Sequence, residues 1–218
     1  MSDAIESSLI NALQDNNVTE LHRLLNAHPD EINKPRGLIK WTLLMLAVRL
    51  GLTAAVDLLC KAGANPNDGD RDGATALFYL TDKSSPQLLD LLVFHGADVN
   101  VQSRFGTLAI HNAVNEGLEE ALILLVSAGT NLSLDKDCQL MMSAIDHQQS
   151  RLFQILIRLG APFHCPTLLQ LACEQHEALY VSELKARNAP FTAEMLDKSP
   201  YKHGSLGNIQ MNTVSSKK

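Results

Sequence analysis

The chain has 218 residues, of which 45% are hydrophobic and 5% aromatic, and its 18 Lys and Arg against 24 Asp and Glu give a formal net charge of −6. This apolar content is too high for a disordered polymer, and the acidic balance offers no basic surface to a nucleic-acid backbone, so we expect no nucleic-acid partner. The longest apolar runs, such as 43–48, are far shorter than the roughly 20 residues that span a bilayer, so we expect no membrane segment.

Residues 1–33 are predicted to form a pair of helices that caps one end of the fold. Leu9, Ala12 and Leu24 begin three series of apolar positions that recur along the chain. The second helix carries His22 and Arg23 on its outer side, which is typical of an end unit that faces water.

Residues 34–162 contain an internal repeat. Gly63, Gly96 and Gly129 lie 33 residues apart, and Gly160 follows in a similar context. Apolar residues recur at helical spacing within each copy, which predicts two short helices, a tight turn and a loop per unit. The predicted repeats are 34–67, 68–100, 101–133 and 134–162, and the position of Leu24 is leucine in every copy: Leu59, Leu92, Leu125, Leu156 and Leu184.

Glycine, serine and proline mark the boundaries of these helices. Gly51 and Gly117 fall between paired helices, where a left-handed backbone costs glycine little. In the third unit the turn is Ser84-Ser85-Pro86, which predicts a serine cap followed by proline at the first helical position. The repeat spacing shrinks after the third full repeat, so we expect shorter loops between the later units.

The C-terminal part is predicted to be a second capping repeat, at 163–198. Glu183 and Lys185 occupy positions that are apolar in interior units, which suits an outer helix at the end of a stack. Residues 199–218 are polar and contain too few apolar side chains to pack, so we expect a flexible tail.

Three segments carry a family signature in part: 42–47 (Thr-Leu-Leu-Met-Leu-Ala), 75–80 (Thr-Ala-Leu-Phe-Tyr-Leu) and 108–113 (Leu-Ala-Ile-His-Asn-Ala). Each is followed by an ending similar to Gly-Ala-Asp-Val-Asn. Over residues 4–190 the chain resembles the ankyrin-repeat family, whose signature is Thr-Pro-Leu-His-x-Ala. The resemblance implies an all-α solenoid of about six stacked helix-turn-helix units with short hairpin loops. Only His111 keeps the signature histidine, and we interpret it as structural.

The resemblance also implies a function without catalysis. Such proteins act as scaffolds, adaptors or inhibitors that bind a protein partner, so we expect a monomeric cytoplasmic protein without a cofactor. The four cysteines do not form the framework of a small secreted domain and favour a reducing compartment. Short chains of this type also occur among proteins that intracellular bacteria deliver into host cells, and the tail 204–218 is where a translocation signal would lie.

A metal-dependent or thiol-dependent protein is the alternative. Cys165, Cys173 and His176 are its candidate residues, although they lack the close Cys-x-x-Cys pair of a structural zinc site. No glycine-rich phosphate loop is present in the sequence.

In proteins of this resemblance the hairpin tips and the exposed side of the first helices line a concave groove. Projecting those positions onto the chain predicts these partner-binding residues: Leu38, Ile39, Trp41, Arg49, Arg71, Lys83, Arg104, Phe105, Glu116, Lys136 and His147, with Asp135 beside them. Aromatic and Arg side chains dominate the energy of typical interfaces, so Trp41 and Phe105 are the expected centres. For Trp41 the alternative is that it fills the space beside Gly37 and packs on the N-terminal cap.

Overall fold

The computed structural model describes residues 2–135, 137–174 and 178–187. These residues fall into two compact units, 1–131 and 132–218. The predicted tail at 199–218 and the end of the predicted C-terminal cap lie outside the described residues.

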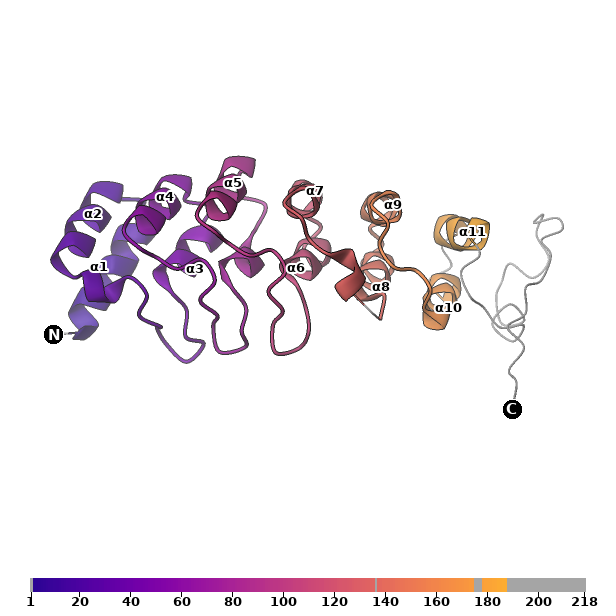
Figure 1. The fold of residues 1–218 in the computed structure, drawn as a ribbon, viewed down its shortest axis with the longest axis horizontal. Coiled ribbons are helices and arrows are strands. Elements are labelled where there is room, and N and C mark those ends of the chain that lie inside the picture. Colours follow the sequence, from indigo (N-terminus) through magenta and orange to yellow (C-terminus); the bar gives the residue numbers. More distant parts are fainter. Residues whose placement is uncertain (1, 136, 175–177, 188–218) are drawn as a thin grey trace. The chain divides into compact units, whose positions relative to one another are not determined.

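The unit 1–131 consists of helix pairs stacked in two layers (Figure 1). The first helices of successive pairs contact one another in one layer, and the second helices do so in the other layer. In chain order the helices are α1 (Ser2–Gln14), α2 (Val18–Ala27), the 3-10 turn η1 (Pro29–Glu31), α3 (Leu43–Arg49), α4 (Thr53–Lys61), the 3-10 turn η2 (Ala76–Tyr79), α5 (Pro86–Phe94), α6 (Ala109–Asn115) and α7 (Glu119–Ser127).

The unit 132–218 contains two further pairs in its described part. These are α8 (Gln139–Asp146) with α9 (Ser150–Arg158), and α10 (Pro166–Glu174) with α11 (Ala178–Ala186), after the 3-10 turn η3 (Leu132–Leu134). Residues 159–165 join α9 to α10, whereas the longer segment 62–75 joins α4 to η2, so the expected shortening of the later loop is confirmed. Phe153 and Tyr180 pack together in the core of this unit, with ring centroids 4.7 Å apart.

The core of each unit is built from the apolar series that recurs in the sequence. The leucine of the second helix is buried in every copy, with an exposed fraction of 7% or less: Leu24, Leu59, Leu92, Leu125, Leu156 and Leu184. One unit cannot hide this apolar face alone, so each pair is stabilised by the pairs that pack on it.

The helix boundaries follow the predicted capping chemistry. The backbone N–H of Leu88 donates to Ser85 Oγ at 3.3 Å, and Pro86 occupies the first turn of α5. Gly51 has a φ of 72°, and a Cβ atom there would lie 2.6 Å from the carbonyl oxygen of Lys83 in the next repeat. The backbone N–H of Leu108 donates to His111 Nδ1 at 3.0 Å, so the structural role of this buried histidine is confirmed.

The third unit differs from the prediction, because its first helix is reduced to the short 3-10 turn η2. The backbone leaves the helix at Leu80, where φ is −59° and ψ is 139°. Other units place a buried alanine here, as at Ala47 and Ala113, whereas Leu80 is larger and equally buried. We attribute the early end of the helix to this residue, since its volume does not fit the close packing that alanine allows.

The cysteines also differ from the prediction. Cys138 and Cys165 form a disulfide in unit 132–218, linking the residues that directly precede α8 and α10. Our expectation of reduced thiols was therefore wrong for this pair, while Cys60 and Cys173 are free and buried. In the part of the chain that the structure covers, no helix has the length and apolar character needed to span a membrane.

Candidate functional site: the hairpin edge

Three hairpins project from the layer of first helices in unit 1–131 (Figure 1), and we name them together the hairpin edge: residues 36–41, 70–74 and 103–107. Backbone hydrogen bonds close each hairpin, for example from Arg36 N to Trp41 O at 2.8 Å. Neighbouring hairpins are also joined, because Arg71 N donates to Ile39 O and Arg104 N donates to Asp72 O, both at 2.8 Å. The tips therefore form a row with a fixed register.

Polar side chains hold the second and third hairpins in shape. Asp70 Oδ1 accepts from the backbone N–H of Asp72 at 2.8 Å and of Ala74 at 2.9 Å. Ser103 Oγ does the same for Phe105 and Thr107 in the next hairpin. These bonds fix the backbone from within, which lowers the conformational entropy that the tips would lose on binding.

Asparagine side chains connect successive repeats on the side of the glycine endings. Asn67 Nδ2 donates to the carbonyl oxygen of Gly96 at 2.8 Å, and its Oδ1 accepts from the backbone N–H of Asp98 at 2.8 Å. The same two bonds recur one repeat before and after, at Asn33 and Asn100. We name Asn33, Asn67 and Asn100 the asparagine ladder; the sequence analysis missed its role, although the near-regular spacing of these residues was a signal for it.

Trp41 lies against the next repeat. Its Nε1 donates to the hydroxyl of Tyr79 at 2.8 Å, and the two ring centroids are 5.0 Å apart at an interplanar angle of 69°. The guanidinium carbon of Arg49 sits 5.0 Å from the centroid of the indole. Tyr79 donates its own hydroxyl proton to Asp70 Oδ2. Burial raises the pKa of Tyr79, and the adjacent Asp70 carboxylate raises it further.

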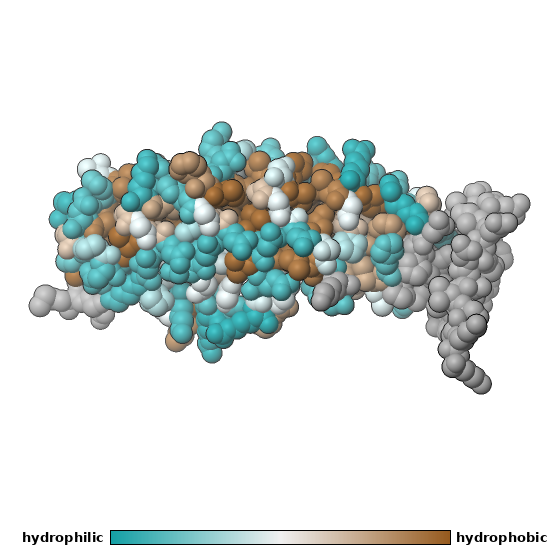
Figure 2. All heavy atoms as spheres, in the orientation of Figure 1, coloured by the Kyte–Doolittle hydropathy of each residue, from teal (hydrophilic) through white to brown (hydrophobic). Residues whose placement is uncertain are grey.

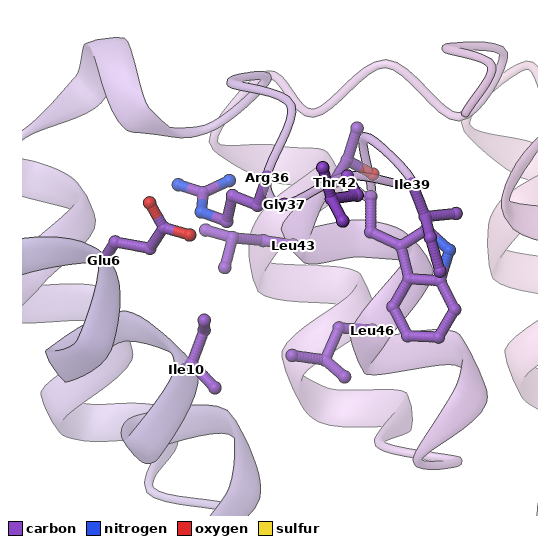
Figure 3. Close-up of a pocket in the computed structure, with 10 residues that line it drawn as sticks. Glu6, Ile10, Arg36, Gly37, Ile39, Thr42, Leu43 and Leu46 are labelled. Atoms are coloured by element: carbon purple, nitrogen blue, oxygen red, sulfur yellow. The ribbon is translucent and has the colours of Figure 1, made fainter. Parts of the chain in front are cut away.

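An apolar pocket opens beside Gly37 (Figure 3), and Trp41 forms part of its lining. The indole lies against Tyr79 rather than filling this space, which was the alternative for Trp41. We name it the N-terminal pocket; it has a volume of about 430 Å³ and lies between α1, the first hairpin and α3. Its lining residues are Glu6, Ile10, Arg36, Gly37, Leu38, Ile39, Trp41, Thr42, Leu43 and Leu46.

A buried cation closes one end of this pocket. Arg36 is 8% exposed, and its Nη2 donates to Glu31 Oε2 at 3.1 Å and to the backbone oxygen of Glu31 at 2.7 Å. Figure 3 shows its guanidinium directed toward the carboxylate of Glu6 on α1. Burial lowers the pKa of Arg36, and the charges of Glu31 and Glu6 oppose that effect. At this end of the pocket, one guanidinium therefore faces two carboxylates, those of Glu31 and Glu6.

The predicted binding residues separate into two groups in unit 1–131. Five of them lie on the hairpin edge with exposed side chains: Leu38 (89%), Ile39 (50%) and Phe105 (74%), with Arg71 and Arg104. Trp41 and Arg49 belong to the same group: Trp41 is half-buried at the base of the first hairpin, and Arg49 covers its indole. The second group consists of Lys83 and Glu116, which are exposed but lie in the turns between paired helices, away from the hairpin tips.

The remaining predicted residues lie in unit 132–218. His147 is exposed at the C-terminal end of α8, and Lys136 falls outside the described residues. The interpretation of Asp135 as a groove residue was wrong, because it is 3% exposed and caps α8. Its two oxygens accept from the backbone N–H groups of Gln139 and Leu140 at 2.8 and 3.0 Å.

The alternative site at Cys165, Cys173 and His176 loses one member. Cys165 is bonded to Cys138, so its sulfur is not available as a thiolate ligand or nucleophile. Cys173 is buried, and His176 lies outside the described residues. Among residues whose placement is known, no three His, Cys, Asp or Glu side chains come close enough together to hold a metal ion.

The hairpin edge is mixed in character. Over unit 1–131, Figure 2 shows hydrophilic and hydrophobic atoms side by side on the projecting loops. The exposed charged residues of the tips are Lys40, Arg71, Asp72 and Arg104, so three cations surround one anion although the whole chain carries −6. The part of the chain that the structure describes contains no ion pair of Lys40, Arg71 or Arg104.

Comparison with known proteins supports the repeat architecture. A family model described as ankyrin repeats (3 copies) matches residues 9–103. Among solved structures, the ankyrin repeat domain of Bcl-3, whose description calls it a unique member of the IκB protein family, is 27% identical. The match has a TM-score of 0.71 and covers 84% of this chain and 86% of that chain. Because 422 structural chains match, likeness of fold does not select a partner. No curated protein matches the chain in sequence.

Proposed function

Because the chain belongs to the ankyrin-repeat family, we propose that it is a non-catalytic module that binds another protein through its hairpin edge and the adjoining surface of the first helices. Ankyrin-repeat domains typically serve as protein-protein interaction modules. In this role the chain acts as a scaffold, an adaptor or an inhibitor, and it needs no cofactor.

One observation carries the proposal. Leu38, Ile39 and Phe105 are large apolar side chains that remain exposed on a backbone held in register by hydrogen bonds between hairpins. Scattered exposed apolar residues are ordinary on protein surfaces, but these three lie on one rigid row beside an open pocket. A rigid surface with apolar anchors and a polar rim is the usual anatomy of a binding interface.

A quantitative pull-down tests the proposal with a matched control. We compare the parent chain with a Leu38→Ala/Phe105→Ala variant and with Phe94→Ala, since Phe94 is 82% exposed on α5, in the layer of second helices. A protein retained by the parent and by Phe94→Ala, but reduced about tenfold or more by the hairpin variant, supports the proposal. Equal retention by all three, at equal thermal stability, contradicts it.

A further inference from the structure

We propose that the N-terminal pocket and the hairpin edge together bind an extended protein segment that places one large apolar side chain in the pocket and acidic side chains along the tips. This inference rests on the proposed function and names the chemistry of the partner.

The pocket suits a single large apolar group. Its volume of about 430 Å³ lies within the range of roughly 300–1,000 Å³ that is typical of ligand sites. Figure 3 shows Ile10 from α1 and Leu43 and Leu46 from α3 converging on it. Most of its lining is apolar, and its one buried cation, Arg36, bonds to Glu31 through Nη2, while its Nε has no hydrogen-bond partner among the described residues. The interior therefore gains more from an apolar group than from a charged one.

The pocket continues directly into the row of tips. Ile39 lines the pocket and also accepts the backbone hydrogen bond of Arg71, which belongs to the second hairpin. Asp72 in that hairpin then accepts from Arg104, next to the exposed ring of Phe105. An extended segment anchored in the pocket therefore runs past Arg71 and Arg104 in turn, which a compact small molecule would not do.

The exposed cations of the hairpin edge favour acidic residues in the rest of the bound segment. Lys40, Arg71 and Arg104 are exposed and make no ion pair within the residues that the structure describes, so their charges are available to a partner. Arg49 adds a fourth cation beside the pocket, above Trp41. The opposing carboxylates are Asp72, the buried Asp70 and Glu6, while Arg36 is paired with Glu31. The four cations therefore exceed the three carboxylates by one, on a chain whose net charge is −6. Complementary potentials favour an acidic partner and reject a basic one.

The test begins with selection of a phage-displayed library of short random peptides on the full chain. We expect enriched peptides to combine a Leu, Phe or Trp with several Asp or Glu residues. Binding of a synthetic copy is then followed by the emission of Trp41, which is the only tryptophan in the chain and forms part of the pocket wall. Enrichment of basic peptides overturns the inference. A selection that enriches no sequence combining an apolar residue with acidic residues overturns it as well.

Variants locate the bound peptide. Ile10→Phe and Leu46→Phe narrow the pocket by different walls, and Arg71→Glu reverses a tip charge. We expect each to weaken binding about tenfold or more, while Phe94→Ala and Arg158→Glu, the matched apolar and charge controls, change it less than about twofold. Binding should also weaken with added salt, because exposed charges are screened. Affinity unchanged in both pocket variants or in Arg71→Glu, with folding intact, contradicts the proposal.

The other occupants give different results. Concentration-dependent dimerisation of the parent that Ile10→Phe abolishes identifies a second copy of the chain as the occupant and overturns the inference. A shift of Trp41 emission by N-acetylphenylalanine amide that equals the shift by the peptide points to a small apolar ligand and overturns it as well. If a basic protein binds in a Leu38- and Phe105-dependent manner, the proposed function survives and only this inference fails.

Discussion

The indole N–H of Trp41 donates to the hydroxyl of Tyr79, one repeat further along the chain, at 2.8 Å. The two rings meet edge to face, with an interplanar angle of 69°. The Tyr79 hydroxyl in turn donates a hydrogen bond to Asp70, whose carboxylate holds the backbone of the second hairpin. Trp41, which we expected either to bind a partner or to pack on the N-terminal cap, is therefore part of the contact between two repeats.

Removal of the Tyr79 hydroxyl should lower stability. In Tyr79→Phe the ring and its contact with Trp41 remain, but Asp70 Oδ2 and Trp41 Nε1 lose a partner. We expect the free energy of unfolding to fall by about 1–3 kcal/mol, measured by urea titration, because a buried carboxylate and a half-buried indole N–H are left unsatisfied. A change below about 0.5 kcal/mol would show that the network contributes nothing to folding.

The same hydroxyl predicts a dependence on pH. The folded-state pKa of Tyr79 is raised above the unfolded value of about 10, so the folded state holds this proton more tightly. Its contribution to stability is complete below pH ~10 and is lost as pH rises through the folded-state pKa. The difference in unfolding free energy between the parent and Tyr79→Phe should therefore narrow above pH ~10, and a difference that widens there contradicts the assignment.

The asparagine ladder should contribute more than an ordinary surface residue. Asn67→Ala removes two hydrogen bonds to the backbone of the next repeat, and we expect a loss of about 1–2 kcal/mol in unfolding free energy. Asn11→Ala on the exposed side of α1 is the control, with an expected change within about 0.5 kcal/mol. Equal effects of the two substitutions in chemical denaturation argue against a stabilising ladder.

Two glycines with positive φ should respond differently to alanine. In Gly51→Ala the new Cβ would lie 2.6 Å from the backbone oxygen of Lys83, whereas in Gly63→Ala it meets nothing within 4 Å. Both substitutions strain the backbone, but only the first also forces two repeats apart. We expect Gly51→Ala to be more destabilising by about 2 kcal/mol or more in thermal or urea unfolding. The reverse order is incompatible with the close approach of these turns.

Reduction should weaken the unit 132–218. The Cys138–Cys165 disulfide joins residues 27 positions apart, and its loss should lower unfolding free energy by about 3 kcal/mol. A Cys138→Ser/Cys165→Ser variant should match the reduced parent and ignore added reductant. Peptide mapping without reductant checks that Cys138 and Cys165 are bonded to each other. Disulfides are rare in the reducing cytosol, which is where we expected the protein. Iodoacetamide labelling of both cysteines in the native, unreduced chain contradicts the pairing.

Much of the fold could be predicted from the sequence, because the helices and turns of each repeat are specified by residues close together in the chain. Apolar periodicity fixed the helix pairs, and Ser85, Pro86 and the glycines fixed their ends. The missed features depend on contacts through space. The first helix of the third unit ends at Leu80, Cys138 and Cys165 meet only after folding, and Trp41 turns toward Tyr79 beside the N-terminal pocket.

The predicted site shows the same division. The resemblance to ankyrin repeats, projected onto the chain, placed Leu38, Ile39 and Phe105 on the binding surface, and they are exposed on the hairpin edge. Lys83 and Glu116 directly precede the predicted turn residues Ser84 and Gly117, so their place between paired helices was readable from the sequence. The distance of those turns from the hairpin tips was not, since the register was projected without the three-dimensional path of the loops. Asp135 was misread because a carboxylate before a helix serves equally as a cap.

Hydrogen–deuterium exchange of the full chain, free and bound to a protein captured in the pull-down, tests the binding surface most directly. We predict slower exchange at residues 36–41, 70–74 and 103–107 on binding, with no change in the exposed second helices α2, α4, α5 and α7. Protection confined to those second helices, with unchanged exchange along the hairpins, would contradict the account.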